Sequence, residues 1–257
     1  MPKELYAVLV EISTFGPISV FIPYASTSAN TYLLPPPTTL VGALAYAYKR
    51  SLNDFKELDE DGSSPAFEMI DKGLVLYASA GVDEQYSFTK SVERVYQHIY
   101  LRSKYWSDVD MTYTVGVRSA TIARKLLAFY IVSSKDVARC SYGIVRIGRK
   151  ESLVSVDNVV IAPLKEVLSN EKSCDTVFYF PLSIAKKYSG DTWIEVDMPK
   201  LVKENFEKKT VVTEKYVVPK PFAFSRATVE LNEYGVTIKM NVCGNIFAIP
   251  IPRKVTE

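Results

Sequence analysis

The chain has 257 residues, of which 47% are hydrophobic, so it can bury a sizeable core and is not a disordered polypeptide. Its net charge is only +2, and its three cysteines form no Cys-x-x-Cys pair, which argues against a zinc cluster or a disulfide framework. No apolar run is long enough to span a membrane, and the N-terminal sequence lacks the apolar segment of a secretory signal. We therefore expect a cytoplasmic protein without a resident metal or cofactor.

The charge is distributed unevenly along the chain. Residues 94–150 contain 11 Lys or Arg and three Asp, a net of +8, whereas the remaining residues contain 20 basic and 26 acidic side chains, a net of −6. A strongly basic block in a nearly neutral protein is typical of a polyanion binder. A solvated charged face fits the same pattern, so charge alone leaves both interpretations open.

The N-terminal part is predicted to form a strand and then a helix. Residues 5–12 are aliphatic and β-branched, which predicts a buried strand. Three prolines then enforce extended backbone, and Thr38 or Thr39 can cap a helix. Apolar residues recur at helical spacing, so we expect an amphipathic helix over 39–52. Residues 53–65 are acidic and contain glycine and serine, which predicts a loop.

The middle of the chain contains two predicted strands, at 74–80 and 126–133. Between them, residues 83–115 are polar and rich in tyrosine, without firm periodicity. Such a segment is typical of a large functional excursion or an irregular hairpin. Residues 144–156 contain two β-like runs around Gly148, which predicts a turn that contains glycine.

The C-terminal part is predicted to be rich in β-structure. A strand is expected at 176–180, followed by a short helix at 181–188. Residues 228–231 and 236–240 alternate around an Asn-Glu-Tyr-Gly segment, which indicates a hairpin. Residues 246–251 form a last strand, and the nearby prolines place it at a sheet edge. The whole pattern predicts an α+β protein with mainly antiparallel sheet.

The sequence offers few side chains that could take part in catalysis. His98 is the only histidine, and it could act as a general base in RNA cleavage through the 2′-hydroxyl group. A surface or stacking histidine is the alternative. The sequence contains no phosphate-binding loop, nucleophile elbow or zinc-protease motif.

Two segments favour nucleic-acid binding. Gly148 lets the backbone approach a ligand closely, and the basic side chains around it can clamp phosphates together with backbone amides. The stretch 86–125 mixes cations with aromatic residues, which suits single-stranded nucleic acid because cations track phosphates and rings stack on bases. An ordinary basic turn and a set of core or interface aromatics are the alternatives.

Three segments carry a resemblance to a known family. Residues 33–48 read LLPPPTTLVGALAYAY, which resembles the start of the first helix in the Cas-five family, RAMP-superfamily subunits of type I CRISPR effector complexes. The detailed form is similar to the archaeal type I-A branch. The strand LYAVLVEIS at 5–13 and the segment IVRIGRKESLVSV at 144–156 resemble the same family. The resemblance covers the N-terminal two thirds well and the C-terminal third only loosely.

The resemblance implies a fold and a role. The fold is a ferredoxin-like (RRM-like) RAMP domain over 1–165 with a thumb insertion around 81–125, followed by a small β-rich region over 166–257. The role is a non-catalytic crRNA-binding subunit of a Cascade complex, which binds the 5′ handle of the crRNA and caps the filament of backbone subunits in antiviral defence. The implied partners are crRNA, a Cas-seven-type backbone subunit, the large and small Cascade subunits and, indirectly, target DNA, with no membrane.

For this role we predict three groups of RNA-binding residues. Phosphate contacts are expected from basic side chains, namely Arg118, Arg124, Lys125, Arg146, Arg149 and Lys150. Main-chain contacts are expected near the start of the first helix and at the glycine turn, from Thr38, Thr39 and Gly148. In the tyrosine-rich stretch, contacts and base stacking are expected from Tyr100, Arg102, Lys104, Tyr105 and Trp106.

Two other functions stay open at this point. One branch of the family cleaves precursor crRNA, and a metal-independent endoribonuclease would use His98 with Tyr96, Tyr100 or Lys104. In type I-A systems a dedicated endonuclease performs that step, and His98 matches no catalytic constellation, so we carry over binding and not cleavage. The other function is an interaction scaffold whose basic block binds an acidic protein.

Overall fold

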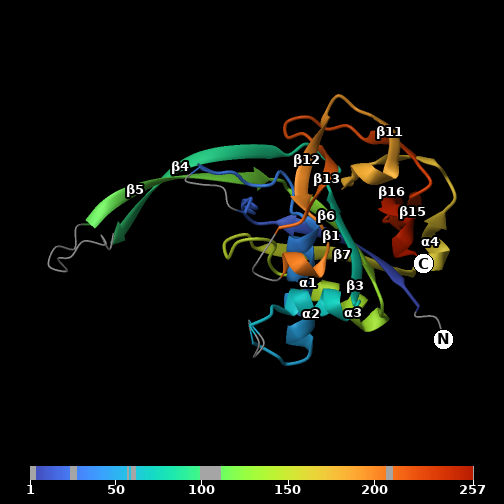
Figure 1. The fold of residues 1–257 in the computed structure, drawn as a ribbon, viewed down its shortest axis with the longest axis horizontal. Helices are drawn as coiled ribbons and strands as arrows, with labels where there is room; N and C mark the ends of the chain where they lie inside the picture. The colour runs from blue at the N-terminus through green and yellow to red at the C-terminus, as the bar shows by residue number, and fades with distance from the viewer. Residues whose placement is uncertain are drawn as a thin grey trace.

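A computed structural model describes residues 4–23, 28–56, 58, 62–98, 111–206 and 211–256, and describes only the backbone of 28–29, 93–98 and 111–118. Figure 1 shows a body built of sheets with most of its helices gathered on one side, from which a long two-stranded ribbon projects. None of the helices in these ranges is long and apolar enough to cross a membrane.

The centre of the body is a four-stranded antiparallel sheet in the order β3-β6-β1-β7. Its strands are β1 (Tyr6–Thr14), β3 (Val75–Gly81), β6 (Lys125–Val132) and β7 (Val154–Pro163). The strands predicted at 5–12, 74–80 and 126–133 are confirmed. The strands and their main covering helices follow one another along the chain in the order β1, α1, β3, β6, α3, β7.

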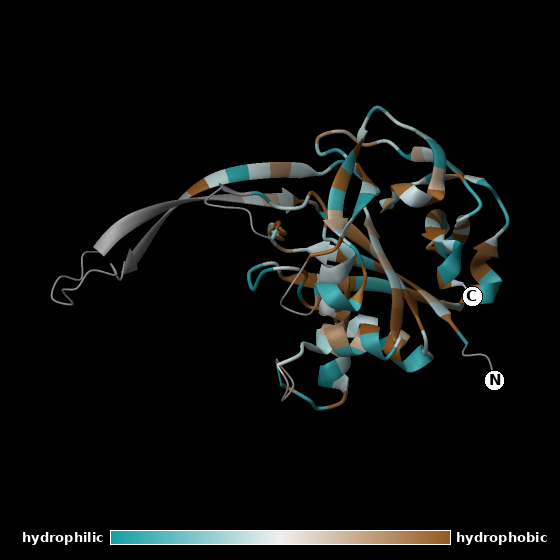
Figure 2. Cartoon of the chain, viewed as in Figure 1, coloured by the Kyte–Doolittle hydropathy of each residue, from teal (hydrophilic) through white to brown (hydrophobic). Residues whose placement is uncertain are grey.

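Strand β1 is buried on both faces, which explains its unbroken apolar run. Val8 and Val10 belong to a core cluster formed with the helices, whereas Ala7 and Leu9 belong to a second cluster formed with the C-terminal strands. Successive side chains of a strand point to opposite faces, so the same chain supplies both cores. Figure 2 shows the hydrophobic colour concentrated along the strands that cross the body.

Helix α1 (Pro37–Ser51) is the principal helix on one face of this sheet. It begins at Pro37, two residues before the predicted start, with Pro36 as the N-cap and no side-chain capping bond. The expectation that Thr38 or Thr39 caps the helix is therefore wrong. A proline suits the first helical position because that backbone nitrogen has no partner in the helix anyway. The shorter helices are α2 (Pro65–Asp71), α3 (Lys135–Arg139) and α4 (Leu164–Val167).

The projecting ribbon is a regular hairpin. Strands β4 (Ser87–His98) and β5 (Met111–Ile122) pair antiparallel along their full length, and β2 (Ser28–Ala29) pairs parallel with β5. Residues 89–92 of β4 are all at least partly exposed, so the strand lacks the alternation of buried and exposed positions that would have marked it in the sequence.

The C-terminal part consists of three small sheets, in the orders β10-β13-β12, β11-β14-β9 and β16-β15-β8. The strands are β8 (Leu168–Ser169), β9 (Ser173–Thr176), β10 (Phe180–Pro181), β11 (Ala185–Ser189), β12 (Trp193–Pro199), β13 (Thr213–Pro219), β14 (Ala227–Leu231), β15 (Gly235–Val242) and β16 (Asn245–Pro252). Strand β16 lies at a sheet edge, as predicted.

Three predictions for this part are wrong. The strand expected at 176–180 is interrupted, because β9 ends at Thr176 and β10 begins at Phe180, and the Tyr179 amide between them donates to the Ala80 carbonyl of β3 at 3.0 Å. Strands β14 and β15 exist where the hairpin was expected, but β14 pairs with β9 and β11, whereas β15 pairs with β8 and β16. A local turn pattern specifies a reversal of the chain but not which strand becomes the neighbour, and other strands, including β16 next in the chain, occupy both edges of β14 and of β15. The helix expected at 181–188 is one short 3-10 turn (Leu182–Ile184) followed by β11, because this segment packs into the third apolar cluster with Phe180 and Trp193.

Candidate nucleic-acid interface

The turn at residues 147–152 lies against the segment that follows β1. The turn is closed by backbone bonds from Ile147 to Ser152 (3.1 Å) and from Ser152 to Arg149 (3.0 Å). Gly148 has a φ of +93°, and a Cβ atom there would lie 3.0 Å from the Ser19 carbonyl oxygen. Both the backbone angle and the close approach therefore require glycine at this position.

Two adjoining pockets lie between this turn and helix α1. The smaller, of about 420 Å³, is lined by Thr39 from α1, by residues 19–21 and by the turn. The larger, of about 750 Å³, extends along α1 to the 54–56 segment and the start of α2. Tyr46, Arg146, Gly148 and Arg149 border both pockets, so the turn forms a ridge between two hollows.

The larger pocket is strongly basic. Its lining includes six basic residues, Lys49, Arg50, Lys56, Arg146, Arg149 and Lys150, against two acidic ones, Asp54 and Glu151, which gives a formal net charge of +4. Like charges at this density repel one another unless an anion lies among them. The pocket is therefore suited to a polyanion.

Aromatic rings lie among these cations. The guanidinium carbon of Arg50 is 4.7 Å from the Tyr46 ring centroid and 5.3 Å from that of Phe55. Arg146 approaches the same Tyr46 ring at 5.6 Å, and Arg149 lies 3.9 Å from the Phe21 ring. These distances are those of cation–π contacts, which place flat cationic and aromatic surfaces in both pockets.

An ion-pair network fixes the wall of the larger pocket. The Lys49 ammonium group lies 3.0 Å from an Asp54 carboxylate oxygen and 2.7 Å from one of Glu68, which in turn pairs with Lys72 at 2.5 Å. Lys49 and then Lys72 lower the pKa of Glu68, whereas the Lys56 backbone amide and then Lys49 lower that of Asp54. The network links α1, the 54–56 segment and α2, and so positions Phe55 beside Arg50.

The structure brings together part of the predicted site. Five predicted residues line the two pockets, namely Thr39, Arg146, Gly148, Arg149 and Lys150. Thr38 is half-buried and lines neither pocket. Arg124 and Lys125 also lie outside the pockets, on the other side of the end of β1, where the Thr14 amide donates to the Arg124 carbonyl and Lys125 is paired with Ser13.

Several predicted residues cannot be placed in the site. Tyr100, Arg102, Lys104, Tyr105 and Trp106 lie outside the described residues. The backbone of Arg118 pairs with Ser91 in the hairpin, but its side chain lies outside the described part of the chain, as do those of Tyr96 and His98. Within the described residues, no group of three or more His, Cys, Asp or Glu side chains could hold a metal ion.

Sequence reasoning missed Phe21, Tyr46, Arg50 and Phe55. Tyr46 and Arg50 were detectable in part, because residues four apart share one face of a helix and Tyr46 lies in the segment with the family resemblance. Phe21 and Phe55 carry no such signal, because only the packing of their loops brings them to α1 and the turn.

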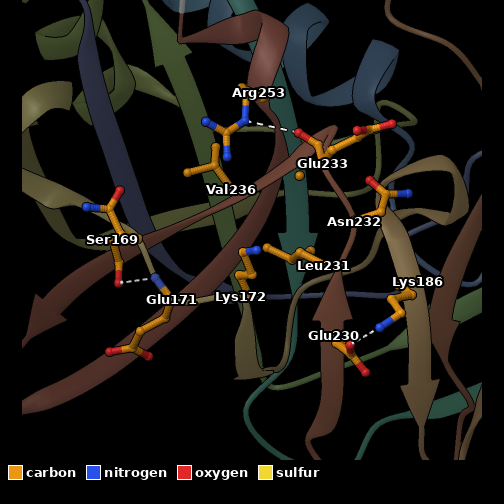
Figure 3. A pocket seen from close by; sticks show the side chains of 12 residues that line it. Ser169, Glu171, Lys172, Lys186, Glu230, Leu231, Asn232, Glu233, Val236 and Arg253 are labelled. Carbon is orange, nitrogen blue, oxygen red and sulfur yellow. Dashed lines mark hydrogen bonds and ion pairs between the residues drawn. The ribbon is translucent and has the colours of Figure 1, made fainter.

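A pocket in the C-terminal part provides a contrast (Figure 3). It has a volume of about 530 Å³ and is lined by three basic residues, Lys172, Lys186 and Arg253, and three acidic ones, Glu171, Glu230 and Glu233. Lys186 pairs with Glu230 at 2.6 Å, and the Arg253 side chain donates to the Glu233 carbonyl at 3.1 Å. The formal charges cancel, so this pocket does not favour an anion.

No family model matches the chain. Three curated proteins of Saccharolobus solfataricus do. The chain is 32% identical to CRISPR-associated protein Cas5 3 over 171 residues and 28% identical to CRISPR system aCascade subunit Cas5 1 over 167 residues, and each match covers 63% of the chain and 66% of the relative. It is 26% identical to CRISPR-associated protein Cas5 2 over 240 residues, which cover 89% of the chain and 86% of that protein.

A solved structure supports the same relationship at the level of the fold. The crystal structure of a CRISPR protein from Archaeoglobus fulgidus superposes with a TM-score of 0.54 over 95% of this chain and 98% of that chain, at 18% sequence identity. The mixed α/β architecture with mostly antiparallel sheets is thus shared with a CRISPR protein. Together with its three archaeal relatives, the chain belongs to the Cas5 family of CRISPR-associated proteins.

Proposed function

We propose that this protein is a non-catalytic, crRNA-binding subunit of a type I-A CRISPR surveillance (Cascade) complex, and that it binds the 5′ handle of the crRNA in the two pockets beside the glycine turn. The observation that carries the proposal is the net charge of +4 around the larger pocket, next to a turn whose backbone only glycine can form. One of the relatives is itself named as a subunit of aCascade.

The phosphates would lie on the ridge between the pockets. Arg146, Arg149 and Lys150 supply charge there, and Gly148 lets the turn that carries them close against Ser19 and Val20. Guanidinium groups form charge-assisted hydrogen bonds with phosphate oxygens, and such contacts fix the path of the strand without reading its sequence.

The bases would lie in the two hollows. Tyr46 with Arg50 and Phe55 on one side, and Phe21 with Arg149 on the other, offer flat surfaces on which unpaired bases stack. Stacking tolerates any base because every base has a π-face, whereas a duplex could not insert its paired bases. The arrangement therefore favours a single-stranded segment such as a handle.

The topology supports the rest of the assignment. The chain order β1-α1-β3-β6-α3-β7 and the sheet order β3-β6-β1-β7 support a ferredoxin-like domain, in which we propose that the β4–β5 hairpin, inserted between the second and third strands, is the thumb. In this proposal residues 166–257 form the small β-rich region. The protein caps the filament of Cas-seven-type subunits and contacts the large and small subunits, so that it meets target DNA only indirectly, in the cytoplasm.

The first test mixes the purified protein with labelled CRISPR repeat RNA in the presence of EDTA and follows both mobility and RNA length. We expect a salt-sensitive shift with the RNA intact, because phosphate contacts release counterions and no cleavage occurs. Site-specific cutting that is lost in His98→Ala would replace the proposal with a metal-independent nuclease. A stoichiometric complex with an acidic protein that survives nuclease treatment, without any RNA shift, would favour the scaffold.

A further inference from the structure

Residues 17–21 lie between the glycine turn and the root of the β4–β5 hairpin and contact both. On one side, a Cβ atom on Gly148 would meet the Ser19 carbonyl at 3.0 Å and Val20 at 3.1 Å. On the other side, Ile18 and Thr121 of β5 exchange two backbone hydrogen bonds of 2.8 Å each. One short segment therefore touches the proposed phosphate site and the hairpin at once.

Three buried serines connect these two contacts. The Ser152 hydroxyl, in the turn, donates to the Pro17 carbonyl at 3.0 Å and accepts from the Ser19 backbone amide at 3.4 Å. The Ser19 hydroxyl donates to the backbone carbonyl of Ser119, in β5, at 2.9 Å. Ser152 is 1% exposed, Ser19 7% and Ser119 0%. Hydrogen bonds shielded from water in this way are costly to break, because a buried group that loses its partner stays unsatisfied.

We infer that Ser152 and Ser19 are positioning residues that couple the glycine turn to the hairpin, so that an anion held at the turn also restrains the root of the hairpin. The inference rests on the proposed function for the identity of the anion, a single-stranded RNA, but the coupling itself is a property of the chain. The Arg149 guanidinium reinforces it, because it lies over Phe21, at the end of the same segment.

The coupling has a functional consequence. A hairpin that projects from the body can swing about its root, and a ligand bound at the turn would shift it toward one orientation if the two elements move together. The thumb would then be set in place by the same RNA that the turn holds, before another subunit or nucleic acid meets it.

Hydrogen exchange of the purified protein, with and without a short single-stranded repeat RNA, tests the inference. In the free protein, Ser152→Ala leaves the Ser19 amide and the Pro17 carbonyl without their partner. We expect exchange at the hairpin root, residues 115–122, to become about fivefold to tenfold faster. With RNA, wild type should gain protection at both 145–153 and 115–122, whereas Ser152→Ala should gain it only at 145–153.

The matched control is Ser141→Ala. Ser141 is also a fully buried serine, and its hydroxyl donates to the Ala138 carbonyl at 2.7 Å, away from the hairpin. This variant should lose about as much stability in urea as Ser152→Ala does, but residues 115–122 should exchange hydrogen at the wild-type rate. If Ser152→Ala does not fold, Ser19→Ala, which removes only the bond to β5, carries the same expectation.

The outcomes separate the two proposals. If RNA protects neither segment of wild type, the proposed function fails, while faster exchange at 115–122 in free Ser152→Ala still supports the coupling. Unchanged exchange at 115–122 in free Ser152→Ala would overturn the coupling. Equal protection of 115–122 by RNA in wild type and in Ser152→Ala would also overturn it, however tightly the RNA binds.

Discussion

The guanidinium carbon of Arg149 lies 3.9 Å from the centroid of the Phe21 ring. Arg149 belongs to the glycine turn and Phe21 to the segment after β1, so this contact closes the smaller pocket from two distant parts of the chain. The face of the guanidinium is held against the ring, as in other cation–π contacts. The contact thus fixes the orientation of a group that we propose binds phosphate.

Removing the charge of the turn should weaken RNA binding. For Arg149→Ala with Lys150→Ala we expect the affinity for repeat RNA to fall about tenfold for each phosphate group that no longer has a cation beside it. Each such phosphate should also lower the slope of log K against log salt by about 0.7, the value for a single strand. Fluorescence anisotropy at several salt concentrations measures both. Lys172→Ala with Lys187→Ala removes the same charge far from the site and should change neither, and an equal loss of affinity in that control would show that only overall charge matters.

Gly148→Ala should abolish the shape of the turn. An alanine there must adopt a φ near +93°, and its Cβ atom would meet the Ser19 carbonyl at 3.0 Å. The control is Gly244→Ala, where φ is +88° but no atom lies within 4 Å of the added carbon. Gly244→Ala should lose about 1–2 kcal/mol of folding free energy in urea titrations because it forces a left-handed backbone, and Gly148→Ala should lose more because its Cβ atom also meets Ser19. Only Gly148→Ala should also lose RNA affinity, because the contact with Ser19 displaces the turn. Equal RNA affinity of the two variants would show that binding does not depend on the position of the turn.

The Tyr46 ring should matter through its face rather than its hydroxyl group. Two guanidinium groups, those of Arg50 and Arg146, contact this ring. Tyr46→Leu should therefore cost about 1–3 kcal/mol of RNA binding, the usual contribution of a stacking ring, whereas Tyr46→Phe should bind as wild type does. Titration calorimetry distinguishes the two. A loss of affinity in Tyr46→Phe as large as in Tyr46→Leu would point to a hydrogen bond from the hydroxyl instead.

The Lys49 network should make stability depend on pH on the acid side. Lys49 and then Lys72 lower the pKa of Glu68 in the folded protein. The Glu68 carboxylate therefore adds to the free energy of unfolding above its unfolded pKa, about 4.3, and this stabilisation is lost as the pH falls through the lower folded pKa. The free energies of unfolding of wild type and Glu68→Gln, measured in urea, should differ most at pH 7 and converge as the pH falls below about 4. A difference that stays constant under strongly acidic conditions would mean that the carboxylate charge is not what stabilises the network.

Much of the central sheet could be read from the sequence because local signals and packing agree there. The apolar run of β1, the helical spacing in α1 and the run of β6 each predict one element, and each is observed. The reversal between β14 and β15 was also readable, but their pairing was not, because β9 and β11 occupy the edges of β14, whereas β8 and the next strand, β16, occupy those of β15.

In the candidate site, too, some features could be predicted from the sequence and others depend on the tertiary structure. By itself, the sequence determined the basic block, the glycine-containing turn and the family resemblance of residues 33–48, because each depends on residue type along a continuous segment. Only the tertiary structure decided that Arg146 and Arg149 face Tyr46 and Phe21, and that Arg124 and Lys125 lie on the other side of the end of β1. Loops carry no periodic pattern, so the packing of β1, α1 and the turn against one another sets which of their side chains meet.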